Sequence, residues 1–218
     1  MEKRYQIFVS STFNDLRDER RMVFDAIIRK KCFPVGMEWF PSLSRDSLGY
    51  IQEIIRDSDF FLLLVGGRYG DSVDENGTSF TELEYRYAIE KGIPVIPFIM
   101  SDWRRAPQLD SEIAKTKKLA DFIDSVKETF DGWKPWTRED LKIFVSEAID
   151  QAKKDYPEAV GWVRGDSLPI DADGVVIDAN RLQVSSDVFI NGHPAVFLAQ
   201  TPSKKRYIET DQGLLELP

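Results

Sequence analysis

Residues 59–70 read DFFLLLVGGRYG, a run of six apolar residues that ends in a glycine-rich turn. An uninterrupted apolar run of this length predicts a β-strand that is buried on both faces, as the strands of parallel sheets are. Similar β-prone segments cover residues 5–10, 33–39 and 94–99. We therefore expect a parallel sheet of four to five strands.

Helical periodicity fills the intervals between these segments. Apolar side chains recur there every three or four residues, which predicts amphipathic helices that pack on the sheet. The three stripes are Leu16, Val23, Ala26 and Ile27; Leu48, Ile51, Ile54 and Ile55; and Phe80, Leu83, Tyr87 and Ala88. Two more helices are expected around residues 119–130 and 141–152, with a break at Gly132 and Pro135 between them. This alternation predicts an α/β fold with helices on both faces of the sheet.

The last part of the chain has a different texture. Helical periodicity stops at Pro157, and the turn signals Asp173-Gly174, Asn191-Gly192 and Gln212-Gly213 separate short β-prone segments. With 218 residues, the chain is long enough for one α/β domain and a small addition. We expect a domain over residues 1–157 and a β-rich annex over residues 158–218, which packs on that domain or on a second copy of the chain.

Composition excludes several classes of function. The net charge of −8 argues against binding to nucleic acid or to an anionic membrane surface. A single cysteine, Cys32, and a single histidine, His193, exclude an internal disulfide and a metal site built from cysteine or histidine clusters. The amino terminus lacks the apolar core of a signal peptide, and no apolar run reaches membrane-spanning length. We expect a cytoplasmic protein without a bound metal or cofactor.

Ligands of parallel sheets bind beyond the carboxyl ends of the strands, so the loops that follow the strands are the first candidates for a site. The loop after the first strand, residues 10–15, reads SSTFND and opens a helix. Amides and hydroxyl groups of Ser10, Ser11 and Thr12 could hold a phosphate there. Alternatively, Asn14 or Thr12 caps the helix and Asp15 complements its dipole.

The loop after the most apolar strand, residues 66–70, combines glycines with one guanidinium and one aromatic ring. Gly67, Arg68 and Tyr69 would suit a nucleotide, because the backbone can approach a ligand closely at glycine. The glycine spacing matches neither of the common phosphate-binding motifs. A tight turn without a ligand is therefore the alternative.

Two carboxylates follow on the third helix, and their positions predict different roles. Ser79 and Glu82 have the spacing of a capping box, and Glu82 stands one turn before Arg86, so a structural role is expected for Glu82. Glu84 falls within the apolar stripe. A carboxylate there either lines a wet cleft or costs several kcal/mol of desolvation unless it is paired. The alternative is an ion pair with Arg68 or another base.

Several of these motifs, in this order, resemble the DUF4062 family, a Toll/interleukin-1 receptor (TIR)-like domain that is frequent in bacterial proteins, including defence proteins. The resemblance covers roughly residues 4–100. The motifs are IFVSSTFNDL at residues 7–16 with Glu19 and Arg20, Asp59, GRYG at residues 67–70, Ser79-x-Thr81-Glu82-x-Glu84-Tyr85 with Ala88, and Gly92-x-Pro94-Val95.

The resemblance implies a flavodoxin-like sheet and, in enzymatic TIR-like members, cleavage of NAD+ by a helix-borne glutamate. That glutamate is followed four residues later by a small residue, a spacing that Glu84 and Ala88 have. The segment from Gly77 to Ala88 is also similar to a motif of nucleoside deoxyribosyltransferases, whose glutamate attacks a sugar carbon. Phe80 and Thr81 stand where many TIR domains have a Trp-Cys pair, so activity does not transfer automatically.

Both similarities imply breakage of an N-glycosidic bond, with Glu84 stabilising or trapping an oxocarbenium-like sugar. Arg68 and the amides of residues 10–12 would hold a diphosphate, and Phe13 or Tyr69 would stack on a ring. NAD+ would then be a substrate rather than a cofactor.

Three functions stay open on the sequence. The first is cleavage of NAD+ or a related nucleotide in defence or signalling, switched on by assembly. The second is a non-catalytic interaction or scaffold module, and the third is glycosyl transfer like that of the deoxyribosyltransferases. A nucleotide, a second copy of the chain or another protein are the expected partners, and nucleic acid and membranes are not.

Overall fold

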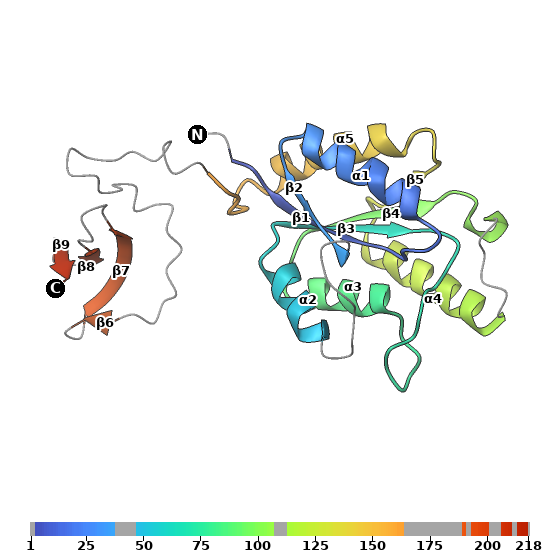
Figure 1. The fold of residues 1–218 in the computed structure, drawn as a ribbon, viewed down its shortest axis with the longest axis horizontal. Coiled ribbons are helices and arrows are strands. Elements are labelled where there is room, and N and C mark those ends of the chain that lie inside the picture. Colours follow the sequence, from blue (N-terminus) through green and yellow to red (C-terminus); the bar gives the residue numbers. More distant parts are fainter. Residues whose placement is uncertain are drawn as a thin grey trace. The chain divides into compact units, whose positions relative to one another are not determined.

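The fold is described from a computed structural model over residues 3–37, 47–106, 113–163, 189–190, 193–200, 206–210 and 213–217 (Figure 1). The chain divides into two compact units. One unit is Lys3–Trp162, and the other is Val163–Pro218 together with Met1–Glu2.

The first unit contains a five-stranded sheet in the order β2-β1-β3-β4-β5. Every pair of neighbouring strands is parallel. The strands are β1 (Gln6–Ser10), β2 (Phe33–Val35), β3 (Phe60–Val65), β4 (Val95–Met100) and β5 (Lys134–Trp136). All residues of β3 are buried, which confirms that the most apolar run forms the middle of a parallel sheet.

Helices cover both faces of this sheet, as the alternating pattern predicts (Figure 1). They are α1 (Arg17–Arg29), α2 (Ser47–Arg56), α3 (Phe80–Glu90), α4 (Ile113–Thr129) and α5 (Leu141–Asp155). One core cluster joins the sheet to α1 and α5, and the other joins it to α2, α3 and α4. The α/β fold class is therefore confirmed.

Two strands differ from the expectation. Residues 132–135, interpreted as a break, include the first two residues of the fifth strand, β5. Pro135 fits there because β5 is an edge strand, in which a residue without an N–H group need not break a hydrogen bond to a neighbouring strand. The next residue, Trp136, is only 1% exposed and anchors the strand in the core. The second strand, expected over residues 33–39, covers Phe33–Val35, and residues 38–39 lie outside the described ranges.

Two details of the helices also correct the sequence analysis. Helix α1 has Leu16 at its N-cap without a side-chain bond, so neither Asn14 nor Thr12 caps it, and Asp18 and Glu19 supply the negative charge of its first turn. On α3 the fully buried residues are Thr81, Tyr85 and Ala88, whereas Phe80, Leu83 and Tyr87 are only partly buried. The helix is therefore rotated by about one position relative to the predicted stripe.

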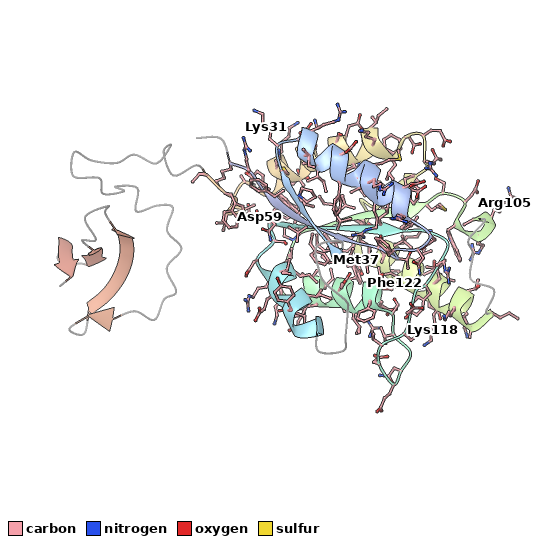
Figure 2. All side chains as sticks on the ribbon, viewed as in Figure 1. Lys31, Met37, Asp59, Arg105, Lys118 and Phe122 are labelled. Carbon is pink, nitrogen blue, oxygen red and sulfur yellow. The ribbon has the colours of Figure 1, made fainter. Side chains whose placement is uncertain are left out.

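The first unit extends to Trp162, five residues beyond Pro157. Arg4 and Trp162 exchange backbone hydrogen bonds. The carboxylate of Asp59, labelled in Figure 2, accepts from the backbone N–H of Gln6 at 2.8 Å and of Gly161 at 2.7 Å. Asp59 therefore fastens this last segment to the amino ends of β1 and β3.

The second unit contains a four-stranded antiparallel sheet in sequence order. Its strands are β6 (Phe189–Ile190), β7 (His193–Gln200), β8 (Arg206–Thr210) and β9 (Gly213–Leu217). The predicted turns at Asp173-Gly174 and Asn191-Gly192 lie outside the described residues, as does Gln212 of the third turn.

Candidate functional site

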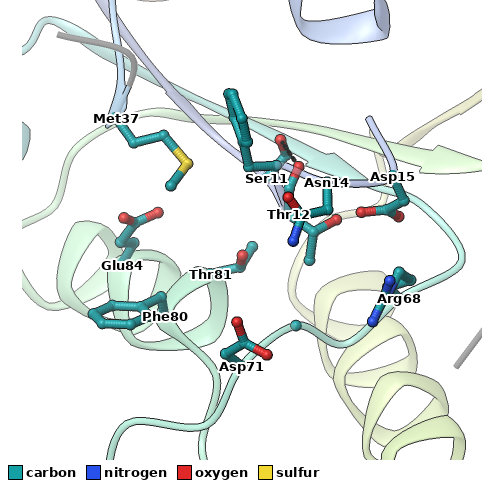
Figure 3. A pocket seen from close by; sticks show the side chains of 12 residues that line it. Ser11, Thr12, Asn14, Asp15, Met37, Arg68, Asp71, Phe80, Thr81 and Glu84 are labelled. Carbon is teal, nitrogen blue, oxygen red and sulfur yellow. Dashed lines mark hydrogen bonds between the residues drawn. The ribbon is translucent and has the colours of Figure 1, made fainter. Parts of the chain in front are cut away.

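A pocket of about 330 Å³ opens at the carboxyl ends of β1 and β3, in the first unit (Figure 3). It is bounded by the loops that follow these strands, by the first turns of α3 and by Met37, which follows β2. The lining residues are Ser11, Thr12, Phe13, Asn14, Asp15, Met37, Arg68, Gly70, Asp71, Phe80, Thr81 and Glu84. The pocket lies where parallel sheets bind ligands.

Glu84 brings its carboxylate to this pocket from the second turn of α3. Its Oε2 accepts a hydrogen bond of 2.5 Å from the Ser10 hydroxyl at the end of β1. Burial raises the pKa of Glu84 from 4.5 to about 7, against the opposing effects of the Ser10 hydrogen bond and the positive charge of Arg20. No ion pair joins Glu84 to another described residue, so the alternative of a salt bridge with Arg68 does not hold.

The hydroxyl groups of Ser10 and Ser11 are already engaged within the protein. Ser10 is 1% exposed and donates to Glu84. Ser11 donates to the Thr12 carbonyl at 2.7 Å and accepts from Arg20 Nη1 at 2.8 Å. Ser11, Thr12 and Phe13 line the pocket, but Ser10 lies behind it and does not. A ligand would therefore meet the backbone and Thr12 rather than the serine hydroxyl groups.

Several backbone N–H groups of the loop at residues 11–14 could donate hydrogen bonds to a ligand. No hydrogen bond connects the N–H groups of residues 11–14 to another residue in the described part of the chain. The Thr12 Oγ1 atom is buried and has no hydrogen-bond partner there either. Amides without a partner among the described residues, in a loop that leads into a helix, are groups of the kind that commonly binds phosphate.

Residues of the second loop take separate places. Arg68 lines the pocket and Gly67 does not. Tyr69 is 3% exposed in the core cluster that contains α3, so its ring is not accessible for stacking on a ligand in the pocket. Gly70 has a φ of +89° and lies so near Thr12 that an added Cβ would stand 2.9 Å from the Thr12 methyl group. Only glycine fits that position without strain.

The start of α3 is held by a network around Glu82. Ser79 is the N-cap, and its hydroxyl accepts from the Glu82 N–H at 3.3 Å. The Glu82 carboxylate bonds to Arg86, as predicted, and accepts from the Tyr69 hydroxyl at 2.6 Å. The Tyr69 oxygen in turn accepts from the Ser79 N–H at 3.3 Å. Tyr69 thus stands where a full capping box would place the Glu82 carboxylate.

Arg20, which the sequence analysis named only as part of a family motif, and Met37, which it did not name, both belong to the site. Arg20 occupies the same stripe of α1 as Leu16, Val23 and Ile27, and it is 1% exposed. A cation on an apolar stripe is the same signal that singled out Glu84, and it could have found Arg20. Met37 follows the second strand, and a search of every loop at the carboxyl ends of the strands would have included it.

Within the described ranges, no group of three or more histidine, cysteine, aspartate or glutamate side chains could hold a metal ion. No helix of the same ranges combines the length and the apolar character that crossing a bilayer requires.

Comparison with known proteins places the chain in a family. No curated protein matches it. Residues 6–150 match the family described as a domain of unknown function, DUF4062. The match extends from β1 into α5 and contains all the lining residues of the pocket. The chain belongs to the DUF4062 family.

Proposed function

We propose that this protein cleaves the N-glycosidic bond of a nucleotide whose base carries a positive charge, with NAD+ as the leading substrate and Glu84 as the catalytic residue. One observation carries the proposal. Glu84 lines the pocket at the carboxyl ends of β1 and β3, and the hydrogen-bond partner of its carboxylate is the neutral hydroxyl of Ser10 rather than a base. A carboxylate that forms no ion pair with a described residue is available to a cationic substrate.

The chemistry needs little more than this carboxylate. The bond between nicotinamide nitrogen and the anomeric carbon breaks, and its electron pair leaves with the nicotinamide, which becomes neutral. The positive charge passes to the sugar as an oxocarbenium ion, which the Glu84 carboxylate stabilises or traps as an ester. Water then adds to the anomeric carbon and releases a proton, giving ADP-ribose; where an ester has formed, its bond to the sugar breaks and the Glu84 carboxylate is the leaving group.

The charges around the pocket favour a cationic leaving group. Three carboxylates, Asp15, Asp71 and Glu84, line the pocket together with one guanidinium, Arg68. This excess of negative charge stabilises a pyridinium base and the cationic transition state. A neutral deoxynucleoside would gain less and would need a general acid to protonate its base. Glycosyl transfer on deoxynucleosides is therefore the less favoured chemistry.

The size of the pocket suggests which part of the substrate it holds. Small-molecule sites span roughly 300–1,000 Å³, and this pocket, at about 330 Å³, is near the lower limit. One nucleoside unit fits such a volume better than a whole dinucleotide. In the proposed arrangement the nicotinamide riboside lies beside Glu84, with Phe13 and Phe80 as ring contacts, and the diphosphate lies near Arg68 and the amides of residues 11–14.

The resemblance to TIR-like domains supports the same substrate and a role in bacterial defence or signalling, in which assembly would switch on the activity. That resemblance comes from the order of the motifs around residues 7–16, 67–70 and 79–88. A role as a scaffold module is the competing proposal, and no contact in the pocket favours it.

The test is release of nicotinamide from NAD+ by the purified full chain, at low and high protein concentration. A Glu84→Gln variant should lose at least a hundredfold in rate, since it removes the charge that the sugar cation requires. Glu82→Gln is the matched control, because Glu82 lies two residues away on the same helix but outside the pocket lining. Release that survives in Glu84→Gln overturns the catalytic role, and base exchange on deoxynucleosides with inert NAD+ favours the transferase.

A further inference from the structure

Ser10 holds one defined oxygen of the catalytic carboxylate. Its hydroxyl donates to Glu84 Oε2 at 2.5 Å. Because Ser10 is only 1% exposed, a ligand in the pocket cannot contact this hydroxyl. Glu84 Oε1 receives no hydrogen bond from any residue in the described ranges. The two oxygens of the carboxylate are therefore inequivalent, and Oε1 is the one left for a ligand in the pocket.

Arg20 holds the backbone on both sides of Ser10. Its Nη1 donates to the carbonyl of Val9 at 3.2 Å and to the hydroxyl of Ser11 at 2.8 Å. These two residues immediately precede and follow Ser10, so a single buried nitrogen spans it. Because Arg20 is 1% exposed, the contacts lie in a region of low dielectric, where hydrogen bonds from a charged donor are strong.

We propose that Ser10 and Arg20 are positioning residues for Glu84. Arg20 fixes the end of β1, Ser10 holds Glu84 Oε2, and Oε1 is thereby presented to the sugar. The assignment of a sugar to Oε1 rests on the proposed function, whereas the positioning itself concerns the protein alone.

The same contacts favour the ionised form of the carboxylate. A donated hydrogen bond stabilises the charged carboxylate more than the neutral acid, and the positive charge of Arg20 acts in the same direction. Asp15, Asp71 and Arg68 are the other charged side chains that line the pocket. Burial is the largest effect, so Ser10 and Arg20 limit a rise in the pKa that would otherwise be greater.

Titration of the Glu84 carboxyl in the substrate-free protein tests the proposal. Carbon-13 NMR of protein labelled at the glutamate carboxyl would follow it, with its signal identified by its absence in Glu84→Gln. Ser10→Ala should raise the pKa of Glu84 above about 7, by about one pH unit, because the donor to the charged form is lost. Ser10→Thr, which keeps a hydroxyl, should return it towards the wild-type value.

Ser58→Ala is the matched control for loss of a buried serine hydroxyl. Ser58 is 7% exposed and donates to the Ile54 carbonyl at 2.8 Å, just before the amino end of β3, so it lies away from the pocket. Its variant should leave the pKa of Glu84 unchanged. An unchanged pKa in Ser10→Ala, or an equal rise in Ser58→Ala, overturns the positioning role of Ser10.

Arg20→Lys separates position from charge, because the lysine keeps the positive charge but is too short to place its nitrogen where Nη1 lies. It should raise the pKa of Glu84 when Ser10 is present and have no further effect in the Ser10→Ala background. An equal rise in both backgrounds overturns the claim that Arg20 acts through Ser10.

Activity measurements then separate this inference from the proposed function. If the protein cleaves NAD+, Ser10→Ala should lower kcat/KM about tenfold below pH 7 and little at pH 9, since the ionised fraction recovers there. A kcat/KM that is unchanged at every pH overturns the role assigned to Ser10. Wild-type protein that is inert towards NAD+, but whose variants show the expected pKa changes, overturns the proposed function and supports the positioning role.

Discussion

The Tyr69 hydroxyl donates a hydrogen bond of 2.6 Å to Glu82, and this contact distinguishes Glu82 from Glu84, two residues further along the same helix. Glu82 is tied to a core tyrosine and to Arg86, whereas Glu84 is bonded to Ser10 and faces the pocket. Burial and the neighbouring Glu82 raise the pKa of Tyr69 to about 12, so Tyr69 stays a hydrogen-bond donor throughout the ordinary pH range. Glu82 is therefore structural and Glu84 is the candidate for chemistry.

Tyr69→Phe should lower the free energy of unfolding by about 1–3 kcal/mol. The variant removes the donor to Glu82 and the acceptor for the Ser79 N–H, both at the start of α3. Urea unfolding would measure the loss. Tyr87→Phe on the same helix is the control, because Tyr87 is only partly buried and makes no hydrogen bond through its hydroxyl to a described residue. Equal midpoints for the two variants would show that the Tyr69 network does not stabilise the helix.

Glu84→Gln should make the fold more stable at alkaline pH. The pKa of Glu84 rises from 4.5 when unfolded to about 7 when folded, so the ionised group opposes folding increasingly between these values and to a constant extent above about 7. The gain above pH 7 has an upper limit of about 3 kcal/mol, and below pH 4.5 it should disappear because the carboxyl is protonated in both states. Unfolding curves at pH 4.5, 6 and 8 would measure it. A gain that is independent of pH would contradict the burial of this carboxylate.

The central strand of the sheet could be predicted from the sequence, because its uninterrupted apolar run is compatible with only one kind of environment. An apolar run such as β3 is shielded from water only inside a sheet that is covered on both faces. Strand β5 has just three residues and contains Pro135, so neither its length nor its composition distinguishes it from a loop. Helix α3 contacts the sheet and also places Tyr85 against Phe122 of α4, with ring centres 5.4 Å apart. A helix with two apolar sides has no single stripe, which explains the error of one position.

The candidate site was predictable in its location but not in its contacts. Glu84 is conspicuous in the sequence, since a carboxylate on an apolar helix face requires a special environment. Its partner Ser10 lies 74 residues away along the chain, and only the parallel pairing of β1 and β3 and the packing of α3 bring the two together. The hydrogen bonds of Tyr69 with Glu82 and Ser79 are equally hidden in the sequence, because no spacing rule connects α3 to the loop after β3.

Gly70→Ala should destabilise the protein by about 1–3 kcal/mol, because an alanine is strained at positive φ. The φ of +89° is one source of strain, and the contact of the new Cβ with the Thr12 methyl group, 2.9 Å away, is another. Thr12→Ser removes that methyl group and keeps the hydroxyl, so it should relieve part of the cost. A double-mutant cycle measured by thermal unfolding would detect the coupling. Strictly additive effects would contradict the close packing of the two loops.

If the protein cleaves NAD+ as proposed, the rate of cleavage should depend on the ionisation of Glu84. If the carboxylate is the reactive form, kcat/KM should rise with pH around a midpoint near the free-enzyme pKa of about 7 and level off above it. The pyridinium of bound substrate stabilises the carboxylate, so the midpoint of kcat should lie below that of kcat/KM. Initial rates between pH 5.5 and 8.5, in buffers of constant ionic strength, would measure both profiles. Glu82→Gln should keep the same midpoints, because Glu82 does not line the pocket. A kcat/KM that falls through pH 7 would instead assign Glu84 as a general acid, and a flat profile would remove it from the chemistry.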